Sequence, residues 1–245
     1  MWLKERPFAH RGLHNEQFPE NSMGSFKNAI KENYFIELDV RLMADDEVVV
    51  FHDANLKRMC KQALQIKKLT SEDLRNKKFY LPNGEKIPLL KDVIKLCQGH
   101  TKLLVEIKMT FSKGTKLEEK VYELIKGQED WIAVQGFAPS TIKWFSENAP
   151  EFLNGYLATH FGNPIADKIY DRVINKVVEK NKVDFLAFNI KSLPSKSIDE
   201  VIKKKEMKLL SWTVKSEDDI KKAKESGVDN IIFEGFIPKD GNYNK

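Results

Sequence analysis

One segment near the start of the chain carries most of the information about its architecture: FIELDVRLMADDEVVVFHD, residues 35–53. Its first part is an apolar, β-branched run, which predicts a buried strand from Phe35 to Val40. The letters ADD at 44–46 predict a tight turn, and residues 47–51 predict a strand running back along the first. Because a parallel crossover needs about a dozen residues or more, this second strand has to return antiparallel, which brings His52 to the end of the first.

The remainder of the chain alternates similar apolar runs with longer segments whose apolar residues are spaced three and four apart. This pattern is typical of strands joined by crossover helices, and hence of a parallel sheet. Eight strands are expected, at Phe8–Arg11, Phe35–Val40, Leu103–Lys108, Ile132–Phe137, Gly155–Thr159, Phe185–Ile190, Leu209–Val214 and Asn230–Glu234. Helices are expected at residues 25–34, 89–97, 116–128, 139–147, 168–182, 197–206 and 216–226.

Eight strands with intervening helices predict an α/β fold, a single (β/α)8 TIM barrel spanning residues 1–245. The length of 245 residues is close to the ~250 typical of one such barrel. An open, doubly wound sheet is the alternative that periodicity alone leaves open. Residues 54–87, after the hairpin, are polar, irregular and too long for an ordinary loop. We interpret them as an insertion over the mouth of the barrel.

The composition favours a globular protein, with 41% hydrophobic and 31% charged residues. No apolar run approaches the ~20 residues that a membrane span needs. The start, MWLKERPFAHRG, has no apolar stretch of signal-peptide length. Cys60 and Cys97 are too few for a disulfide framework and lack metal-site spacing, which suits a reducing compartment. We therefore expect a cytoplasmic protein without stable membrane insertion.

The net charge is +5, and the lysines are mostly interleaved on helix faces, as at Lys203–Lys205. A nucleic-acid-binding protein would instead be expected to gather its basic residues in a patch with exposed aromatic side chains. The charge pattern therefore predicts no nucleic-acid partner. It is compatible with a mild attraction for anionic small molecules.

Three acids stand where apolar residues would be expected. Glu37 and Asp39 lie two apart in IELDV and so face the same side of the sheet, and Glu106 repeats the anomaly in LLVEIK. Burying unpaired carboxylates is costly, so they either converge on a divalent cation, or lie on an exposed face or beside lysines. Active sites of (β/α)8 barrels lie at the carboxyl ends of the strands, which favours convergence. An all-oxygen set would favour Mg²⁺ or Ca²⁺ over zinc.

Two histidines are expected beside these acids, His10 at the end of the first strand and His52 delivered by the hairpin. A reaction that expels an alkoxide needs a proton donor, and the attacking oxygen needs a base, roles that suit a histidine pair. Either histidine alone would more often be structural. Arg11 could hold a phosphate bidentately or form a surface ion pair. Lys108 could contact a phosphate or pair with an acid.

Five pieces of this sequence, in this order, resemble the signature of glycerophosphodiester phosphodiesterases. They are AHRG (9–12), PENS (19–22) with the helix that follows, residues 35–53, IPLLKDVI (87–94) and LLVEIK (103–108). The order and spacing of five pieces make the resemblance much more specific than any single motif. LLSWTV, residues 209–214, resembles the penultimate strand of that family more weakly.

The resemblance implies a hydrolase that splits a glycerophosphodiester, its small-molecule substrate, into glycerol 3-phosphate and an alcohol. It implies a divalent metal held by the acids at 37, 39 and 106, and acid/base histidines at 10 and 52. Substrate contacts are implied at Arg11, Lys108, Glu20 and Trp212, with Glu20 near the metal shell. Glu20 could equally be a solvated loop acid. The insertion, with Leu56 and Arg58, matches the extra lid segment of the family.

Two other functions stay open at this stage. One is a phosphodiesterase acting on lysophospholipids, which an exposed apolar lid on the insertion would favour. The other is a non-catalytic barrel that binds glycerophosphoryl groups, since a fold does not by itself prove a function. The presence of all three acids and both histidines argues for the enzyme.

Overall fold

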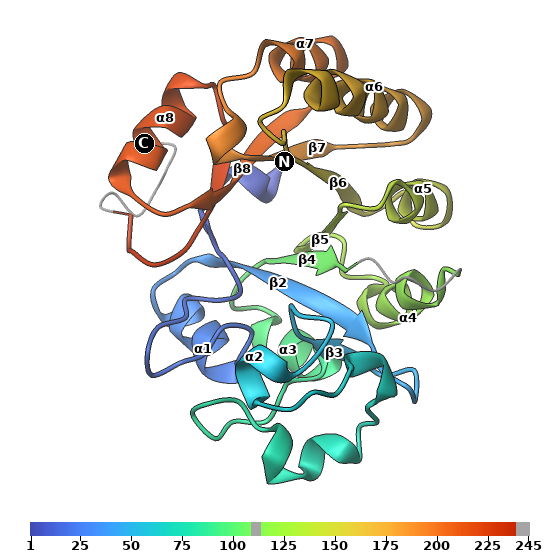
Figure 1. Cartoon of the computed structure of the whole chain (residues 1–245), viewed down its shortest axis with the longest axis vertical. Helices are drawn as coiled ribbons and strands as arrows, with labels where there is room; N and C mark the ends of the chain where they lie inside the picture. The colour runs from blue at the N-terminus through green and yellow to red at the C-terminus, as the bar shows by residue number, and fades with distance from the viewer. Residues whose placement is uncertain (109–113, 239–245) are drawn as a thin grey trace. The chain divides into compact units, whose positions relative to one another are not determined.

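The computed structural model describes residues 1–108 and 114–238 (Figure 1). Its strands are β1 Phe8–Ala9, β2 Phe35–Leu42, β3 Val48–Val50, β4 Leu103–Ile107, β5 Ile132–Gly136, β6 Leu153–Ala158, β7 Phe185–Asn189, β8 Lys208–Val214 and β9 Asn230–Phe233. Its α-helices are α1 Met23–Lys31, α2 Lys57–Cys60, α3 Leu90–Cys97, α4 Lys116–Ile125, α5 Pro139–Asn148, α6 Pro164–Lys180, α7 Lys196–Lys205 and α8 Glu217–Glu225. Short 3-10 helices lie at Trp2–Lys4, Ile66–Lys68, Asp73–Arg75, Lys77–Phe79 and Ile190–Ser192.

The order of these elements is that of a (β/α)8 TIM barrel, and the predicted fold class is confirmed. All eight predicted barrel strands are present, and β3 is the additional strand of the predicted hairpin. The seven predicted helices are present too, with ends that differ by a few residues. By its internal contacts the chain divides into two compact units, Ala9–Ile132 and Met1–Phe8 with Ala133–Lys245.

The unit Ala9–Ile132 is organised around β2. This strand pairs in parallel with β4, and Asp39 is the register partner of Glu106. It pairs antiparallel with β3 on its other side, with Val40 opposite Val50, as the hairpin interpretation predicted. The residues of β2 from Phe35 to Val40 are all buried, so both faces of the strand are covered. The acids of β2 and β4 are therefore held by strands whose register is fixed on both sides.

The insertion, residues 54–87, has an apolar core of its own. It contains α2 and three of the 3-10 helices, which agrees with the irregular pattern of its sequence. Its buried side chains form one cluster with the hairpin, made of Met43, Val49, Phe51, Leu56, Cys60, Ile66, Leu69, Leu74, Phe79, Leu81 and Ile87. This packing gives an otherwise irregular segment a defined conformation.

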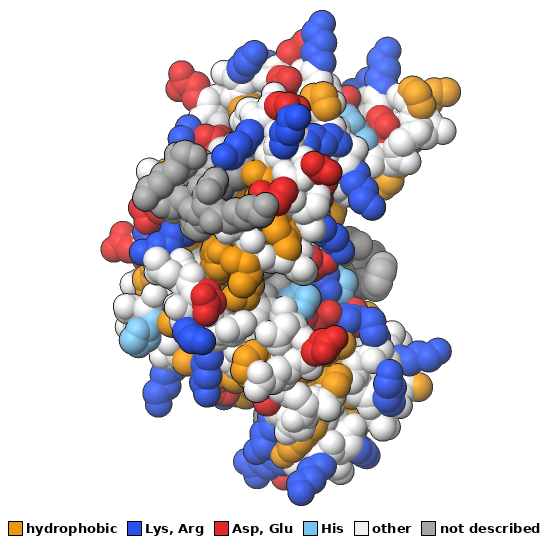
Figure 2. Space-filling model, turned by 90° about the vertical axis from the view of Figure 1, so that its left-hand side faces the viewer, with side chains coloured by type: hydrophobic (Ala, Val, Ile, Leu, Met, Phe, Trp, Pro, Cys, Tyr) orange, Lys and Arg blue, Asp and Glu red, His pale blue; other side chains and the backbone are white. Residues whose placement is uncertain are grey.

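In the second unit, strands β5 to β9 are each paired in parallel with the next along the chain. Helices α5 to α8 connect them, and α6 packs against α7 (Figure 1). Within the described part of the chain, none of the helices combines the length and the apolar composition needed to cross a bilayer. On the face drawn in Figure 2, lysine and arginine side chains are scattered among acidic ones over the surface.

Candidate active site

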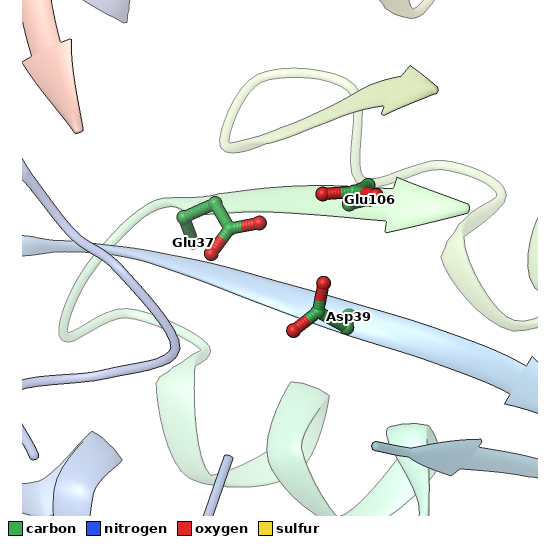
Figure 3. A group of neighbouring side chains, drawn as sticks. All are labelled: Glu37, Asp39 and Glu106. Atoms are coloured by element: carbon green, nitrogen blue, oxygen red, sulfur yellow. The ribbon is translucent and has the colours of Figure 1, made fainter. Parts of the chain in front are cut away.

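Three carboxylates meet between β2 and β4 (Figure 3). Glu37, Asp39 and Glu106 each offer an oxygen, and these oxygens all lie within 4.8 Å of one another. The three residues are buried, with 1%, 0% and 6% of their surface exposed. Two-residue spacing puts Glu37 and Asp39 on one face of β2, and the parallel register puts Glu106 beside Asp39. The structure thus brings together the three acids that the sequence singled out.

Two cationic side chains contact this cluster. The Nζ of Lys108 lies 2.7 Å from Oδ1 of Asp39 and 2.5 Å from Oε1 of Glu106. The Nε of Arg11 lies 3.3 Å from Oδ2 of Asp39, and its backbone N–H donates to Oε2 of Glu37 at 3.0 Å. Burial acts against the charge of Lys108, but the carboxylates of Asp39 and Glu106 outweigh it and raise its pKa. Both cations are therefore held in the charged form.

The three acids respond differently to this environment. Burial acts to raise the pKa of Asp39, but Lys108 and Arg11 outweigh it and hold that pKa far below its usual range. Burial, with the charges of Asp39 and Glu106, raises the pKa of Glu37 well above its usual value. Burial also raises the pKa of Glu106 to about 7, against the opposing charge of Lys108. Three carboxylates share two contacting cations, and the cluster resists carrying its full negative charge.

A divalent cation suits this donor set. The oxygens are close enough to share one ion and are shielded from solvent. If all three acids were ionised, their charge would exceed that of the two cations, Arg11 and Lys108, that contact them. Hard cations such as Mg²⁺ and Ca²⁺ take carboxylate oxygens as ligands, and their charge relieves repulsion between acids. No nitrogen or sulfur ligand of the kind zinc prefers belongs to this group of three residues.

His10 and Arg11 are presented by a sharp turn directly after β1. Arg11 has a φ of +57° and Gly12 a φ of +78°, both in the left-handed region. A Cβ on Gly12 would meet Oγ of Ser25 at 2.4 Å, so glycine is required there. The turn leaves Nε2 of His10 3.9 Å from Oε2 of Glu37. This histidine therefore lies beside the acid cluster.

The loop before α1 packs directly on this turn and on the cluster. Asn21, with a φ of +54°, donates from Nδ2 to Oδ2 of Asp39 at 2.8 Å, and its Oδ1 accepts from the backbone N–H of Asp39 at 3.3 Å. Ser22 is the residue that caps α1, in a capping box with Ser25. From the sequence alone, either Asn21 or Ser22 could cap this helix, and no contact between Asn21 and the acids was predicted. The signal that was missed is that the side-chain amide of an asparagine can donate to the carboxylate of a buried aspartate and also accept from its backbone N–H.

His52 returns to this region on the hairpin, as predicted. The side chain of Arg41 donates from Nε and Nη2 to the backbone oxygen of His52, at 2.8 and 2.6 Å. Nδ1 of the His52 ring lies 2.7 Å from Oδ1 of Asp53. Burial lowers the pKa of His52, against the charge of Asp39, which favours the neutral imidazole near pH 7. With Nδ1 bonded to Asp53, Nε2 is the ring nitrogen left for other chemistry.

Glu20 is held by two arginines. Its Oε1 accepts from Nη1 of Arg11 at 2.9 Å, and both its oxygens accept from the guanidinium of Arg58 at 2.7 Å. Burial acts to raise the pKa of Glu20, but the bonds and charges of the two arginines lower it, so the residue is a carboxylate. The structure thus gives Glu20 ion-pair partners, where the sequence offered a solvated loop acid as one interpretation.

Trp212 lies on β8, in the second unit. Its Nε1–H donates to the backbone oxygen of Ala187 at 2.9 Å, and its ring makes an edge contact with Phe137, with centroids 5.5 Å apart. These contacts fix the orientation of the indole. The role of Trp212 in substrate binding stays a prediction.

A match to a known family agrees with this site. Residues 10–235 match the model of the glycerophosphoryl diester phosphodiesterase family. The chain belongs to this family. The matched range covers nearly the whole chain, including all residues described in the acid cluster and both histidines. The resemblance stated from five short motifs is therefore confirmed.

Individual relatives agree in fold and length. A glycerophosphodiester phosphodiesterase of Caldanaerobacter subterraneus is 28% identical over 239 residues, covering 94% of each chain. The crystal structure of a glycerophosphodiester phosphodiesterase from Thermotoga maritima superposes with a TM-score of 0.72 at 25% identity, covering 92% of each chain. The structure of a phosphodiesterase of Oleispira antarctica in complex with the product sn-glycerol-3-phosphate has a TM-score of 0.77 at 20% identity, covering 96% of this chain and 93% of that one.

Proposed function

We propose that the chain hydrolyses glycerophosphodiesters to glycerol 3-phosphate and an alcohol, with a divalent cation at Glu37, Asp39 and Glu106 and with His10 and His52 as the acid/base pair. The observation that carries the proposal is the group of three buried carboxylates whose oxygens lie within 4.8 Å of one another. The family assignment supplies the reaction class, because a product-bound member of this fold holds glycerol 3-phosphate. We propose Mg²⁺ or Ca²⁺ because all the donors are oxygens.

The charged side chains around the cluster are suited to a phosphodiester. A bound divalent cation would neutralise phosphate charge as a Lewis acid. Arg11 and Lys108 present fixed positive charge to the same place, and both are held by the acids they contact. Glu20 orients Arg11 through its 2.9 Å bond and so acts on the substrate through that guanidinium. We propose Trp212 as a further substrate contact, on the family resemblance alone.

The two histidines are proposed to move the protons. One takes the proton of the attacking oxygen as the new P–O bond forms, and the other protonates the alcohol oxygen as its P–O bond breaks. The attacking oxygen belongs to water, or to the free hydroxyl of the glycerol group, in which case a cyclic phosphate forms first. Phosphorus NMR during the digestion of glycerophosphocholine separates these routes, since a transient cyclic species forms only on the second.

The alternative substrates receive less support. An exposed apolar lid on residues 54–87 would have favoured lysophospholipids. Among the described residues, the large hydrophobic side chains that are exposed all lie outside the insertion, whose own apolar residues pack into its core. A non-catalytic binding role does not require two histidines near an acid cluster. A small glycerophosphodiester therefore remains the proposed substrate.

The remaining proposals concern context. We propose that residues 1–245 form one domain, with 54–87 as its insertion. We also propose a cytoplasmic protein without a nucleic-acid partner. Cys60 and Cys97, both free and buried, are compatible with a reducing compartment.

The test is the release of glycerol 3-phosphate from several glycerophosphodiesters, with and without EDTA. We expect EDTA, His10→Ala and His52→Ala each to abolish most of the activity, and His100→Ala, which alters an exposed histidine, to leave it unchanged. Removing a general acid or base typically costs about 10²- to 10⁴-fold in rate. Activity that survives EDTA and both substitutions would contradict the proposed mechanism.

A further inference from the structure

The guanidinium of Arg58, on helix α2 of the insertion, lies between two carboxylates and forms a paired contact with each. Nη1 and Nη2 donate to Oε2 and Oε1 of Glu20, both at 2.7 Å. Nε and Nη2 donate to Oδ2 and Oδ1 of Asp53, at 2.8 and 3.1 Å. The bonds to Glu20 and Asp53 raise the pKa of Arg58 above its usual value. Paired contacts of this kind fix the plane of each carboxylate as well as its distance.

One of these two carboxylates, that of Asp53, orients His52. Oδ1 of Asp53 lies 2.7 Å from Nδ1 of His52, and the same oxygen accepts from Arg58. Although burial acts to raise the pKa of Asp53, the bonds from Arg58 and His52 lower it, so the group is an acceptor for the imidazole. A carboxylate on one ring nitrogen selects the tautomer and aims the other nitrogen. Arg58 is the group that holds this carboxylate in place.

The other carboxylate, that of Glu20, orients Arg11. Oε1 of Glu20 accepts from Arg58 and also from Nη1 of Arg11, at 2.9 Å. The same Arg11 guanidinium contacts Asp39 of the acid cluster through Nε. Arg58 is thus connected to His52 through the carboxylate of Asp53. It is connected to Arg11 through the carboxylate of Glu20. Glu20 and Arg58 are 38 residues apart in sequence, so this connection exists only in the folded chain.

We propose that Arg58 is a positioning residue through which the insertion sets the orientation of His52 and Arg11. The inference rests on the proposed function, because it assigns Arg58 a part in a reaction carried out by those residues. Arg58 itself exchanges no proton and forms no bond in that reaction. Its loss leaves Asp53 free to turn away from the imidazole and leaves Glu20 with Arg11 as its remaining arginine partner.

Substitutions of Arg58 should change the orientation of His52 and Arg11 without unfolding the insertion. The side chain of Arg58 is 47% exposed and does not belong to the apolar cluster that holds the insertion together. Arg58→Ala, Arg58→Gln and Arg58→Lys are therefore expected to keep the melting temperature of the parent within a few degrees. Lys57→Ala is the matched control, since Lys57 is the preceding residue of α2 and its side chain is exposed.

The first measurement is steady-state kinetics of glycerol 3-phosphate release by the cation-loaded protein. We expect Arg58→Ala to lower kcat by about 10- to 100-fold, the range typical when a group that orients an active residue is removed. Arg58→Lys should recover only part of the loss, because one ammonium cannot form two paired contacts. Arg58→Ala and Asp53→Asn should be strongly non-additive, since both break the same connection. Added guanidinium ion should restore part of the activity of Arg58→Ala.

The second measurement does not depend on activity. In protein labelled with ¹⁵N-histidine, long-range proton–nitrogen spectra report which ring nitrogen carries the proton. We expect one defined tautomer of His52 in the parent and in Lys57→Ala, and a mixture of tautomers in Arg58→Ala. An inactive parent would refute the proposed function. An active parent with unchanged kcat and tautomer in Arg58→Ala would refute only the role of Arg58, as would a raised KM with unchanged kcat, which would make Arg58 a substrate contact.

Discussion

Gly12 is the position where one added methyl group should damage both the stability and the site. Its φ is +78°, and a Cβ there would lie 2.4 Å from Oγ of Ser25, 2.9 Å from Cδ1 of Phe26 and 2.9 Å from the backbone carbon of Ser25. The left-handed backbone costs a residue with a Cβ roughly 1 to 2 kcal/mol. Overpacking of this kind adds about 1 to 3 kcal/mol. Gly12→Ala is therefore expected to lose about 2 to 5 kcal/mol of unfolding free energy.

Gly84 provides the control that separates the two terms. Its φ is +85°, and a Cβ there would find nothing within 4 Å. Gly84→Ala should therefore lose only the backbone term, roughly 1 to 2 kcal/mol. The excess loss in Gly12→Ala measures the steric clash with α1. It should be accompanied by lower activity, because the backbone N–H of Gly12 donates to the carbonyl oxygens of Ala9 and Glu37 and so holds the turn that presents His10.

The assay is urea unfolding followed by circular dichroism, with turnover measured on the same preparations. Equal losses of stability in Gly12→Ala and Gly84→Ala would show that the contact with Ser25 is readily relieved. That result would refute the argument that this turn requires glycine for steric reasons. A larger loss of stability in Gly12→Ala than in Gly84→Ala, together with reduced turnover in Gly12→Ala, is the outcome that the structure predicts.

Three further predictions follow from buried groups. Mg²⁺ or Ca²⁺ at about 100 times its dissociation constant should stabilise the parent by about 2.7 kcal/mol, with a clearly smaller rise in melting temperature for Glu106→Gln. Burial raises the pKa of the Cys60 and Cys97 thiols to about 11 and about 12, so both should resist a thiol reagent at pH 8 until urea unfolds the chain. Gly155→Ala should destabilise strongly, since its Cβ would lie 2.0 Å from Cζ of Phe185, whereas Gly127→Ala, with open space around it, should not clash; equal losses would contradict this packing.

Much of the site could be predicted because its signals are local. Alternation along a strand puts Glu37 and Asp39 on one face whatever the rest of the chain does. The short ADD turn forces an antiparallel return and delivers His52. Neither argument depends on contacts between distant residues. For that reason the strands, the hairpin and the set of acids and histidines could all be named from sequence.

The partners of those residues could not be predicted in the same way. The motif PENS leaves open whether Asn21 or Ser22 caps the helix that follows; in the structure the cap is Ser22, and the amide of Asn21 binds Asp39. Arg58 was noted only as part of a lid segment, yet it holds Glu20 and Asp53. An arginine, an asparagine or a glutamate in a loop has many possible partners within reach. Only the packing of loop on strand selects among them.

By itself, the sequence determined the eight strands, the helices between them, and the kinds of side chain gathered near β2 and β4, because periodicity and turn chemistry act over a few residues. The tertiary structure decided the register that puts Asp39 beside Glu106, the place of Lys108 between two acids, and the connection from Arg58 to His52 and Arg11. These depend on atoms brought together from distant parts of the chain. The free energy of each of these contacts depends on how deeply its groups are buried and on which charges surround them, and no local sequence pattern encodes either.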